Sequence, residues 1–223
     1  MKEKFELTER VDFLKEACMN KKVLHLGCTD YPYTQNSIAN NMLLHFEIEK
    51  VAKELYGFDF DQAGIDILKE AGVQNIYRAD LENLTEVPLE ETFDVILAGE
   101  MIEHLSNPGL FLRGIKRFMN RETILLITTI NAYCGMRNVI YALRGKGGKN
   151  EPVHQDHVAY YSYSTLKLII EREGLALEKF SFYDIGKEHR PFNRWYWNLV
   201  NDVCVKFFPQ LADGIIAECR LMK

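Results

Sequence analysis

The sequence KVLHLG at residues 22–27 is a short apolar run that ends on a glycine. Such a run is typical of a buried strand that enters a tight turn, because glycine adopts backbone angles that other residues avoid. Similar apolar runs recur along the chain. They lie at residues 55–58, 75–78, 93–98 (FDVILA), 123–129 (TILLITT), 175–183 and 214–221. We therefore predict seven strands.

Segments with helical features separate most of these strands. The predicted helices span residues 37–53, the stretch from Asp61 to Gly72, a stretch that begins at Asn107-Pro108, and residues 164–173. Aspartate and asparagine suit the N-cap, proline suits the first helical position, and glycine commonly follows a helix end. Strands that alternate with helices indicate an α/β fold, in which helices cover both faces of a parallel sheet.

Composition narrows the class of protein. The chain has 223 residues, of which 47% are hydrophobic and 26% charged, so it can bury a substantial core. It has 27 basic and 32 acidic residues, and the net charge of −5 argues against a protein that mainly coats nucleic acid. The five scattered cysteines are expected to be reduced thiols. Without a signal peptide or a long apolar run, we expect a cytoplasmic protein with no transmembrane segment.

Small and polar residues directly follow the first four predicted strands. In an open α/β sheet, ligands bind beyond the carboxyl ends of the strands, near the point where strand order reverses. The residues at these ends are Gly27, Cys28, Thr29 and Asp30, then Asp59, then Asp80, and finally Gly99 and Glu100. We expect them to form a ligand-binding edge.

These motifs, in this order, resemble those of the class I S-adenosylmethionine-dependent methyltransferases, in their small-molecule branch. The matching phrases VLHLGC, GFDFD, RADLENL, FDVILAGEMIEHL and ILLITTINAY cover about half of the chain, and DHVAYYSYSTLKLIIEREG continues the likeness. The resemblance implies a Rossmann-like three-layer sandwich with a mostly parallel seven-stranded sheet whose last strand is antiparallel. It also implies S-adenosyl-L-methionine as methyl donor and S-adenosyl-L-homocysteine as product.

We assign residues 1–223 to a single methyltransferase domain. An N-terminal helix is expected in residues 1–20, and the cofactor-binding half spans residues 22–129. Residues 130–163 interrupt the regular pattern and are expected to form a substrate-side insertion. Residues 190–208 are rich in aromatic side chains and are expected to pack as a lid or edge segment. An acceptor pocket, a dimer contact and a membrane-surface contact are the alternatives for this segment.

The resemblance assigns cofactor-binding roles to nine residues. They are Gly27, Cys28, Thr29, Asp59, Phe60, Asp80, Leu81, Gly99 and Glu100. Asp59 is expected to accept hydrogen bonds from the ribose hydroxyls, because a carboxylate only accepts. The alternative is that Asp59 and Asp61 merely cap a helix. Phe60 is expected to lie against adenine, with a core position as its alternative. Asp80 and the backbone N–H of Leu81 are expected to pair with the adenine ring, or Asp80 is a solvated loop residue.

His104 and His157 are the candidate catalytic residues. A histidine near the acceptor could remove a hydroxyl proton, because its pKa lies close to neutral pH. His104 could equally be structural, and His154 and His157 are its rivals as base. Since the sulfonium already makes the methyl group electrophilic, alignment alone could suffice. The His154-x-x-His157 pair lacks a nearby third ligand in the sequence, so we expect no metal.

Three residues depart from the usual family pattern. Thr29 and Tyr31 stand where the glycine-rich loop commonly continues with glycines, and His25 stands where an acidic residue is common. The side chains of Thr29 and Tyr31 could crowd the cofactor or reshape the loop.

Three alternatives to methyl transfer remain. A dinucleotide dehydrogenase would need Gly-x-Gly-x-x-Gly after the first strand, which residues 27–32 do not show. Asp59-Phe60-Asp61 matches the Asp-x-Asp of glycosyltransferases, but so short a motif occurs by chance. The main alternative is a catalytically inactive methyltransferase-like binding or scaffold protein. We expect a small-molecule acceptor, methylated at oxygen, with a glycan or lipid link and a homodimer left open, and no nucleic acid partner.

Overall fold

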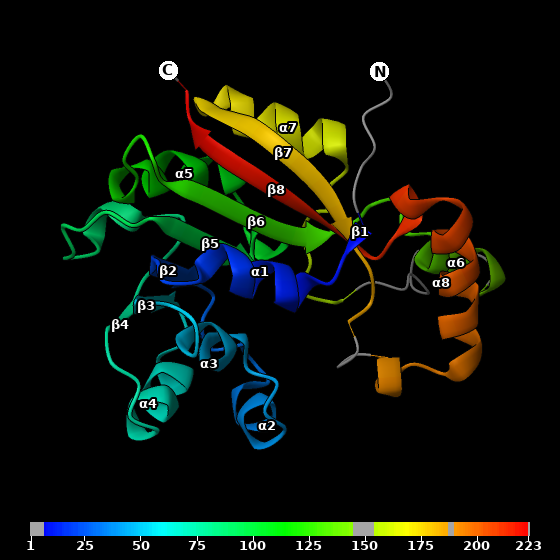
Figure 1. Cartoon of the computed structure of the whole chain (residues 1–223), viewed down its shortest axis with the longest axis horizontal. Coiled ribbons are helices and arrows are strands. Elements are labelled where there is room, and N and C mark those ends of the chain that lie inside the picture. The colour runs from blue at the N-terminus through cyan, green and yellow to red at the C-terminus, as the bar shows by residue number, and fades with distance from the viewer. Residues whose placement is uncertain (1–6, 145–153, 187–189, 223) are drawn as a thin grey trace.

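The computed structural model of the protein describes residues 7–144, 154–186 and 190–222. Strands and helices alternate along most of the chain (Figure 1). The strands are β1 (Leu7–Thr8), β2 (Lys22–Leu26), β3 (Glu54–Asp59), β4 (Ile76–Arg78), β5 (Val95–Gly99), β6 (Ile124–Ile130), β7 (Leu175–Tyr183) and β8 (Gly214–Leu221). The α-helices are α1 (Arg10–Cys18), α2 (Thr34–Ala39), α3 (Leu44–Glu49), α4 (Gln62–Glu70), α5 (Pro108–Gly114), α6 (Gly135–Arg144), α7 (Tyr163–Arg172) and α8 (Trp195–Phe207).

The described strands form one sheet in the order β1-β7-β8-β6-β5-β2-β3-β4. The pairs that β8 makes with β6 and β7 are antiparallel, and the other pairs are parallel. The seven predicted strands and the antiparallel last strand are therefore confirmed. The sheet has one strand more than predicted, because the two residues of β1 pair with the end of β7. A strand of two residues is too short to give a sequence pattern.

Helices cover both faces of the sheet, which confirms the predicted three-layer sandwich (Figure 1). Neighbouring side chains of one strand enter different apolar clusters, because successive residues of a strand point to opposite faces. In β2, Val23 shares a buried cluster with Leu14 of α1 and Ile48 of α3. The next residue, Leu24, belongs to a cluster that contains Phe111 of α5. The central strands are therefore apolar on both faces, as their sequences predicted.

The prediction of one helix over residues 37–53 is wrong, because the segment forms the two short helices α2 and α3. Asn41 lies between them at φ +56°, a left-handed conformation that asparagine tolerates better than most residues. Leu43 is extended at the N-cap of α3. Leu44 and Ile48 still pack together on the inner face of α3, which explains why the apolar periodicity looked continuous.

The ends of α4 and α5 confirm the predicted caps. Asp61 caps α4, since its Oδ2 accepts a 2.8 Å hydrogen bond from the backbone N–H of Gly64. Gly72 follows α4 at φ +91°. Asn107 caps α5 by accepting a 3.3 Å hydrogen bond from the N–H of Leu110. Both caps stabilise the loops that follow β3 and β5.

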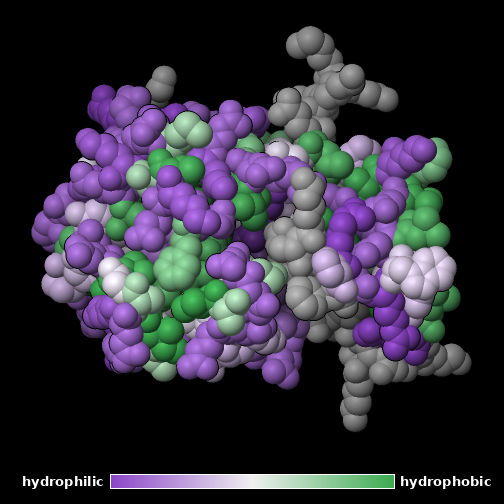
Figure 2. Space-filling model, turned by 60° about the horizontal axis from the view of Figure 1, so that its bottom comes forward, coloured by the Kyte–Doolittle hydropathy of each residue, from purple (hydrophilic) through white to green (hydrophobic). Residues whose placement is uncertain are grey.

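Helices α6 and α8 pack against each other beside the end of the sheet at which β7 ends and β8 begins (Figure 1). Four large apolar side chains are exposed on α8: Trp195, Leu199, Val203 and Phe207 are 75%, 55%, 51% and 68% exposed. The charged Asp202 and Lys206 are exposed among them. Figure 2 shows hydrophobic side chains at the outer edge of this part of the molecule. Within the described ranges no helix has the length and apolar character needed to cross a membrane. We define the four exposed apolar residues of α8 as the α8 stripe.

Candidate active site

The carboxyl ends of β2, β3, β4 and β5 lie along one edge of the sheet. Strand order reverses between β2 and β5, since the chain runs outward through β3 and β4 and then returns to the other side of β2. Ligands of open α/β sheets bind at such a reversal. Gly27 follows β2 and Gly99 ends β5, so the fold places both at this point.

The loop after β2 turns at Gly27, whose φ of +72° would strain any residue with a Cβ. Thr29 is fully buried and packs against Gly64 of α4, where an added Cβ would lie 2.7 Å from the Thr29 Cβ. Tyr31 and Tyr33 are 68% and 53% exposed. The Thr29 side chain is thus buried between the loop and α4, whereas the side chains of Tyr31 and Tyr33 lie on the outer surface of the loop.

Asp59 links the ends of β2 and β3. Its side chain is buried, its Oδ2 accepts a 2.9 Å hydrogen bond from the N–H of Thr29, and its Oδ1 accepts a 3.0 Å bond from the N–H of Asp61. The helix-cap alternative therefore holds for Asp61 and not for Asp59. A carboxylate has about four acceptor positions, so Asp59 retains capacity for two ribose hydroxyls.

Phe60 and Asp80 lie at the surface of this edge. Phe60 is 63% exposed, and the guanidinium of Arg78 stands 5.1 Å from its ring centroid. The core alternative for Phe60 is therefore wrong. Asp80 is exposed, and its Oδ1 accepts a 2.9 Å hydrogen bond from the N–H of Glu82, while Leu81 is buried. The adenine contacts of Asp80 and Leu81 stay predictions.

These features fit the nucleoside of S-adenosylmethionine. A glycine turn lets a ligand approach the backbone, a buried carboxylate can accept from a ribose, and an exposed aromatic ring offers a face to adenine. Gly27, Asp59 and Phe60 supply the three features from the ends of neighbouring strands.

Glu100 is held by two residues that the sequence analysis missed. Arg10 Nη1 lies 3.4 Å from Glu100 Oε2, and the hydroxyl of Tyr183 donates a 2.6 Å hydrogen bond to Oε1. Arg10 belongs to α1 and Tyr183 to β7, so no local motif connects them to Glu100. Glu100 itself adopts φ +50°, which turns the chain sharply after β5.

The two candidate catalytic histidines lie in contact. The ring centroids of His104 and His157 are 4.7 Å apart, and His154 lies 5.1 Å from His157 and 6.2 Å from His104. His104 stands in a 3₁₀ turn (Ile102–His104) just after β5, whereas the other two come from the segment before α7. The rivals of the sequence analysis thus form one group, which we call the histidine cluster.

Desolvation lowers the pKa of two histidines of the cluster. The His104 side chain is exposed on one side, and its partial desolvation lowers its pKa. Burial together with the neighbouring histidines lowers the pKa of His157 to about 4. Both imidazoles are therefore neutral near pH 7, and the low pKa makes His157 a weaker base than a free histidine. Glu103 beside them is fully buried, and burial and the nearby Glu100 raise its pKa to about 7.

A half-buried ion pair borders the histidine cluster and was also missed by the sequence analysis. Arg137 Nη2 of α6 lies 2.8 Å from Asp213 Oδ1, and Arg137 Nη1 donates a 3.1 Å hydrogen bond to the Asp213 backbone oxygen. Burial raises the pKa of Asp213, and Arg137 contributes to the low pKa of His157. This pair places a fixed cation beside the site.

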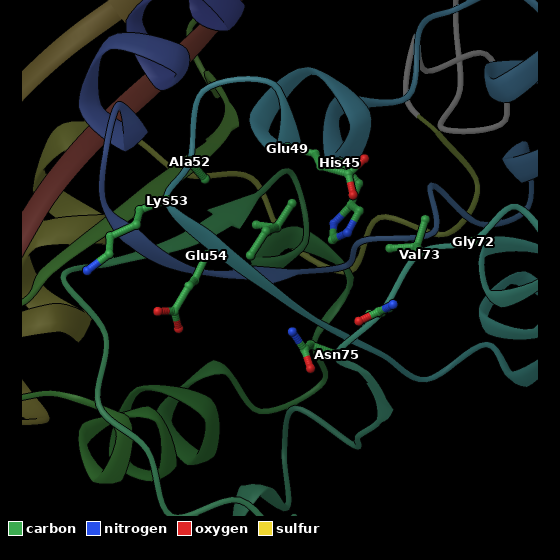
Figure 3. Close-up of a pocket in the computed structure, with 10 residues that line it drawn as sticks. His45, Glu49, Ala52, Lys53, Glu54, Gly72, Val73 and Asn75 are labelled. Atoms are coloured by element: carbon green, nitrogen blue, oxygen red, sulfur yellow. The ribbon is translucent and has the colours of Figure 1, made fainter.

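Two of the cavities among the described residues lie outside the histidine cluster. One of about 380 Å³ lies between the loop after β2 and α4, lined by residues that include Tyr31, Tyr33 and Asp61. The other, of about 340 Å³, includes His45 and Asn75 and is shown in Figure 3. It opens at the amino ends of β3 and β4, on the opposite edge from Gly27 and Asp59. Of these two, the first cavity adjoins the expected cofactor loop.

The chain matches the family described as "Methyltransferase domain" over residues 7–179. Curated relatives include a "Ubiquinone biosynthesis O-methyltransferase" of Bradyrhizobium diazoefficiens, which is 25% identical over 93% of this chain and 82% of the relative. The protein of the same name from Azorhizobium caulinodans is 33% identical over 49% of this chain. That match spans 40% of the Azorhizobium protein. The match with the protein of the same name from Bartonella tribocorum spans 42% of that protein, so the chain covers less than half of each of these two relatives.

Solved structures of low sequence identity share the fold. A "SAM dependent methyltransferase" of Archaeoglobus fulgidus aligns with a TM-score of 0.60 at 18% identity, over 95% of this chain and 91% of its own. The magnesium protoporphyrin IX methyltransferase of Synechocystis, solved with S-adenosylhomocysteine (SAH), aligns with a TM-score of 0.57 at 11% identity, over 96% and 82% of the chains. With the family match over most of its length, the chain belongs to the class I S-adenosylmethionine-dependent methyltransferases, for which S-adenosylmethionine is the methyl donor.

Proposed function

We propose that the chain transfers the methyl group of S-adenosylmethionine to a hydroxyl oxygen of a small-molecule acceptor. The observation that carries this proposal is the histidine cluster, in which neutral His104 and His157 lie just beyond β5. A neutral imidazole can take the proton that a hydroxyl loses on methylation. The names of the curated relatives, which specify O-methylation, support the same chemistry.

The chain's own residues divide the remaining tasks. S-adenosylmethionine supplies an electrophilic methyl group when it is bound. Gly27, Asp59 and Phe60 would hold and orient its nucleoside, since they gather at the carboxyl ends of β2 and β3. Glu100, fixed by Arg10 and Tyr183, would border the methionine part. Alignment of donor and acceptor then contributes much of the rate.

Binding of SAH tests the cofactor half of the proposal. Ligand at about 100 times its dissociation constant adds about 2.7 kcal/mol to stability, which is roughly 5–10 °C in unfolding temperature for a chain of this size. Asp59→Asn should abolish most of this rise, because the amide nitrogen cannot accept a hydrogen bond. Asp61→Asn is the matched control, since asparagine is as good an N-cap as aspartate. An equal loss in both variants would contradict the assignment of Asp59.

Turnover tests the acceptor half. SAH formation should appear with acceptors that carry phenolic or aliphatic hydroxyls, and not with matched amines. His104→Gln and His157→Gln should lower kcat without removing SAH binding. Methylation of amines alone would overturn the oxygen assignment. SAH binding with no turnover on any acceptor class would favour the inactive binding protein instead.

The α8 stripe supports a lipid-linked acceptor. Its four apolar side chains are exposed at intervals of four residues, on a face of α8 that also carries Asp202 and Lys206. Helix α8 packs on α6, which carries Arg137 beside the histidine cluster. Such a face can lie in the headgroup region of a membrane. In a Trp197→Phe background, where Trp195 is the remaining tryptophan, lipid vesicles should shift the emission to the blue, and Leu199→Asp should remove the shift. No shift, or a dimer in light scattering that Leu199→Asp dissociates, would reject this acceptor class.

A further inference from the structure

The histidine cluster and Glu103 together have the composition of a metal site. One ligand atom from each of Glu103, His104 and His157 lies within 4.8 Å of the other two. The sequence places Glu103 and His104 more than fifty residues before His157, so the third ligand that the His154-x-x-His157 pair lacked comes from the turn after β5. We infer that Glu103, His104 and His157 bind a divalent transition-metal cation such as Zn²⁺ or Mn²⁺.

Glu103 presents an unsatisfied carboxylate oxygen. The side chain is 0% exposed, and its Oε2 accepts a 2.8 Å hydrogen bond from the hydroxyl of Thr129. Its Oε1 is buried and has no hydrogen-bond partner among the residues that the structure describes. A buried polar atom without a partner costs about 1–3 kcal/mol, and more when it is charged. A bound cation would supply the missing partner, while Thr129 would hold the carboxylate in orientation.

His104 has one ring nitrogen committed to a backbone acceptor. Its Nδ1 lies 3.1 Å from the carbonyl oxygen of Asp156. A carbonyl oxygen only accepts, so Nδ1 carries the proton and Nε2 keeps its lone pair. Metal-binding histidines commonly use this arrangement, in which a backbone carbonyl fixes the tautomer and the ring direction. The second sphere of the site is therefore in place.

His157 offers a second imidazole with a free position. Its Nδ1 is buried and, in the described part of the chain, has no hydrogen-bond partner. The backbone after it is tied to Glu103, because the N–H groups of Val158 and Ala159 donate hydrogen bonds of 2.8 and 3.2 Å to the Glu103 carbonyl oxygen. This tie holds two ligands from distant segments side by side.

The ligand set indicates which cations fit. Two imidazoles and one carboxylate suit Zn²⁺, Mn²⁺, Fe²⁺ or Co²⁺, whereas Ca²⁺ and Mg²⁺ prefer oxygen ligands throughout. Ligand atoms of a tetrahedral site about 2.1 Å from the metal lie about 3.4 Å apart, so the three groups, whose ligand atoms lie within 4.8 Å of one another, must close by up to about 1.4 Å. Three protein ligands leave a position open for water or for an acceptor oxygen.

A cation here would add to the proposed methyl transfer. A hydroxyl bound to a divalent cation loses its proton more readily than a free one. With the cation in place, His104 and His157 would act as its ligands, and the cation would lower the pKa of the acceptor hydroxyl. This role rests on the proposed function, whereas cation binding itself does not.

Cobalt binding tests the site without any measurement of activity. Untagged protein, stripped with a chelator, is titrated with Co²⁺ while visible absorption and calorimetry are recorded. We expect one Co²⁺ per chain with nitrogen and oxygen ligation, and a higher unfolding temperature with Co²⁺ or Zn²⁺. Strong sulfur-to-cobalt charge-transfer bands would instead show binding at a cysteine and would overturn the site, as would no binding at millimolar Co²⁺.

Variants locate the bound ion. Glu103→Gln keeps the shape and the Thr129 contact, and His104→Gln changes an exposed side chain, so at least the second variant will fold. Each should weaken Co²⁺ binding at least about tenfold, since even the mutation of a residue that only hydrogen-bonds to a metal ligand lowers metal affinity by about this factor. His45→Asn, which changes a buried histidine elsewhere, is the matched control. Unchanged affinity in His104→Gln, or an equal loss in His45→Asn, would overturn the assignment.

Discussion

Tyr183, the last residue of β7, donates a 2.6 Å hydrogen bond from its hydroxyl to Oε1 of Glu100, the residue that follows β5. The same carboxylate pairs through Oε2 with Arg10 of α1. Three segments that are distant in the sequence thus meet on one side chain. Because Glu100 stands where β5 enters the turn that carries Glu103 and His104, its anchoring positions the whole histidine side of the site.

Removal of this hydroxyl should be measurable as a loss of stability. Tyr183→Phe deletes a hydrogen bond to a charged group, which contributes about 1.5–3 kcal/mol. We expect a decrease of that size in the free energy of unfolding, measured with urea. Tyr141→Phe, on the exposed side of α6, is the control and should change stability little. Equal stability of the two variants would contradict the role of the Tyr183–Glu100 bond.

Gly214 makes room for the ring of Tyr183. The two residues pair across β7 and β8, and a Cβ on Gly214 would lie 1.9 Å from Cζ of Tyr183. Gly214→Ala should therefore destabilise the protein by about 3 kcal/mol or more, at the upper end of the cost of overpacking. In a Tyr183→Ala background the same substitution should cost far less, because the clashing ring is gone. Additive losses in the double-mutant cycle would refute this steric coupling.

The strands and helix caps could be predicted from the sequence, but the contacts between distant segments could not. Residues 22–27 predicted β2, and Asp61 and Asn107 predicted the starts of α4 and α5, because these signals are local. The single helix over residues 37–53 failed because one left-handed residue, Asn41, interrupts an otherwise continuous apolar periodicity.

In the candidate site, too, single residues could be predicted from the sequence, but the contacts between distant segments could not. His104 and His157 were each predicted, but their contact depends on hydrogen bonds between the backbone of Glu103 and that of Val158 and Ala159. The ion pair of Arg137 and Asp213 joins α6 to the start of β8, and no motif marks either residue. Such pairings are consequences of topology, so they become visible only when the sheet is assembled.

A stacked pair of buried histidines should make the fold sensitive to acid. His25 of β2 and His45 of α3 are buried, with their Nδ1 atoms 3.2 Å apart and their rings 5.4 Å apart. Burial lowers the pKa of His25 well below its usual value and that of His45 to about 4. An unfolded histidine has a pKa of about 6.5, so between pH 6.5 and pH 4 the unfolded state binds more protons than the folded state. Stability is therefore full above pH 6.5 and falls as the pH decreases toward 4.

Urea unfolding between pH 7 and pH 5 measures this effect. His45 alone should account for a decrease of about 2 kcal/mol at pH 5, since its folded and unfolded pKa values differ by about 2.5. His45→Asn, which keeps a polar group near the position of Nδ1, should reduce the decrease by that amount. An equally steep decrease in wild type and variant would assign the acid sensitivity to other groups.

The ion pair of Arg137 and Asp213 should stabilise the protein more than an exposed pair of the same type. The side chains of Arg137 and Asp213 are 22% and 18% exposed, whereas Arg113, which pairs with Glu173, is 63% exposed. Arg137→Met leaves the Asp213 carboxylate desolvated and without its cation, which costs about 3 kcal/mol at the lower end for buried pairs. Arg113→Met should cost less than about 1 kcal/mol, because an exposed pair contributes little. Urea unfolding of both variants measures the difference. Similar losses of stability in Arg137→Met and Arg113→Met would show that the Arg137 pair is solvated like the exposed one. Recovery of stability in the double variant Arg137→Met/Asp213→Asn would identify the unpaired Asp213 carboxylate as the cause of the loss.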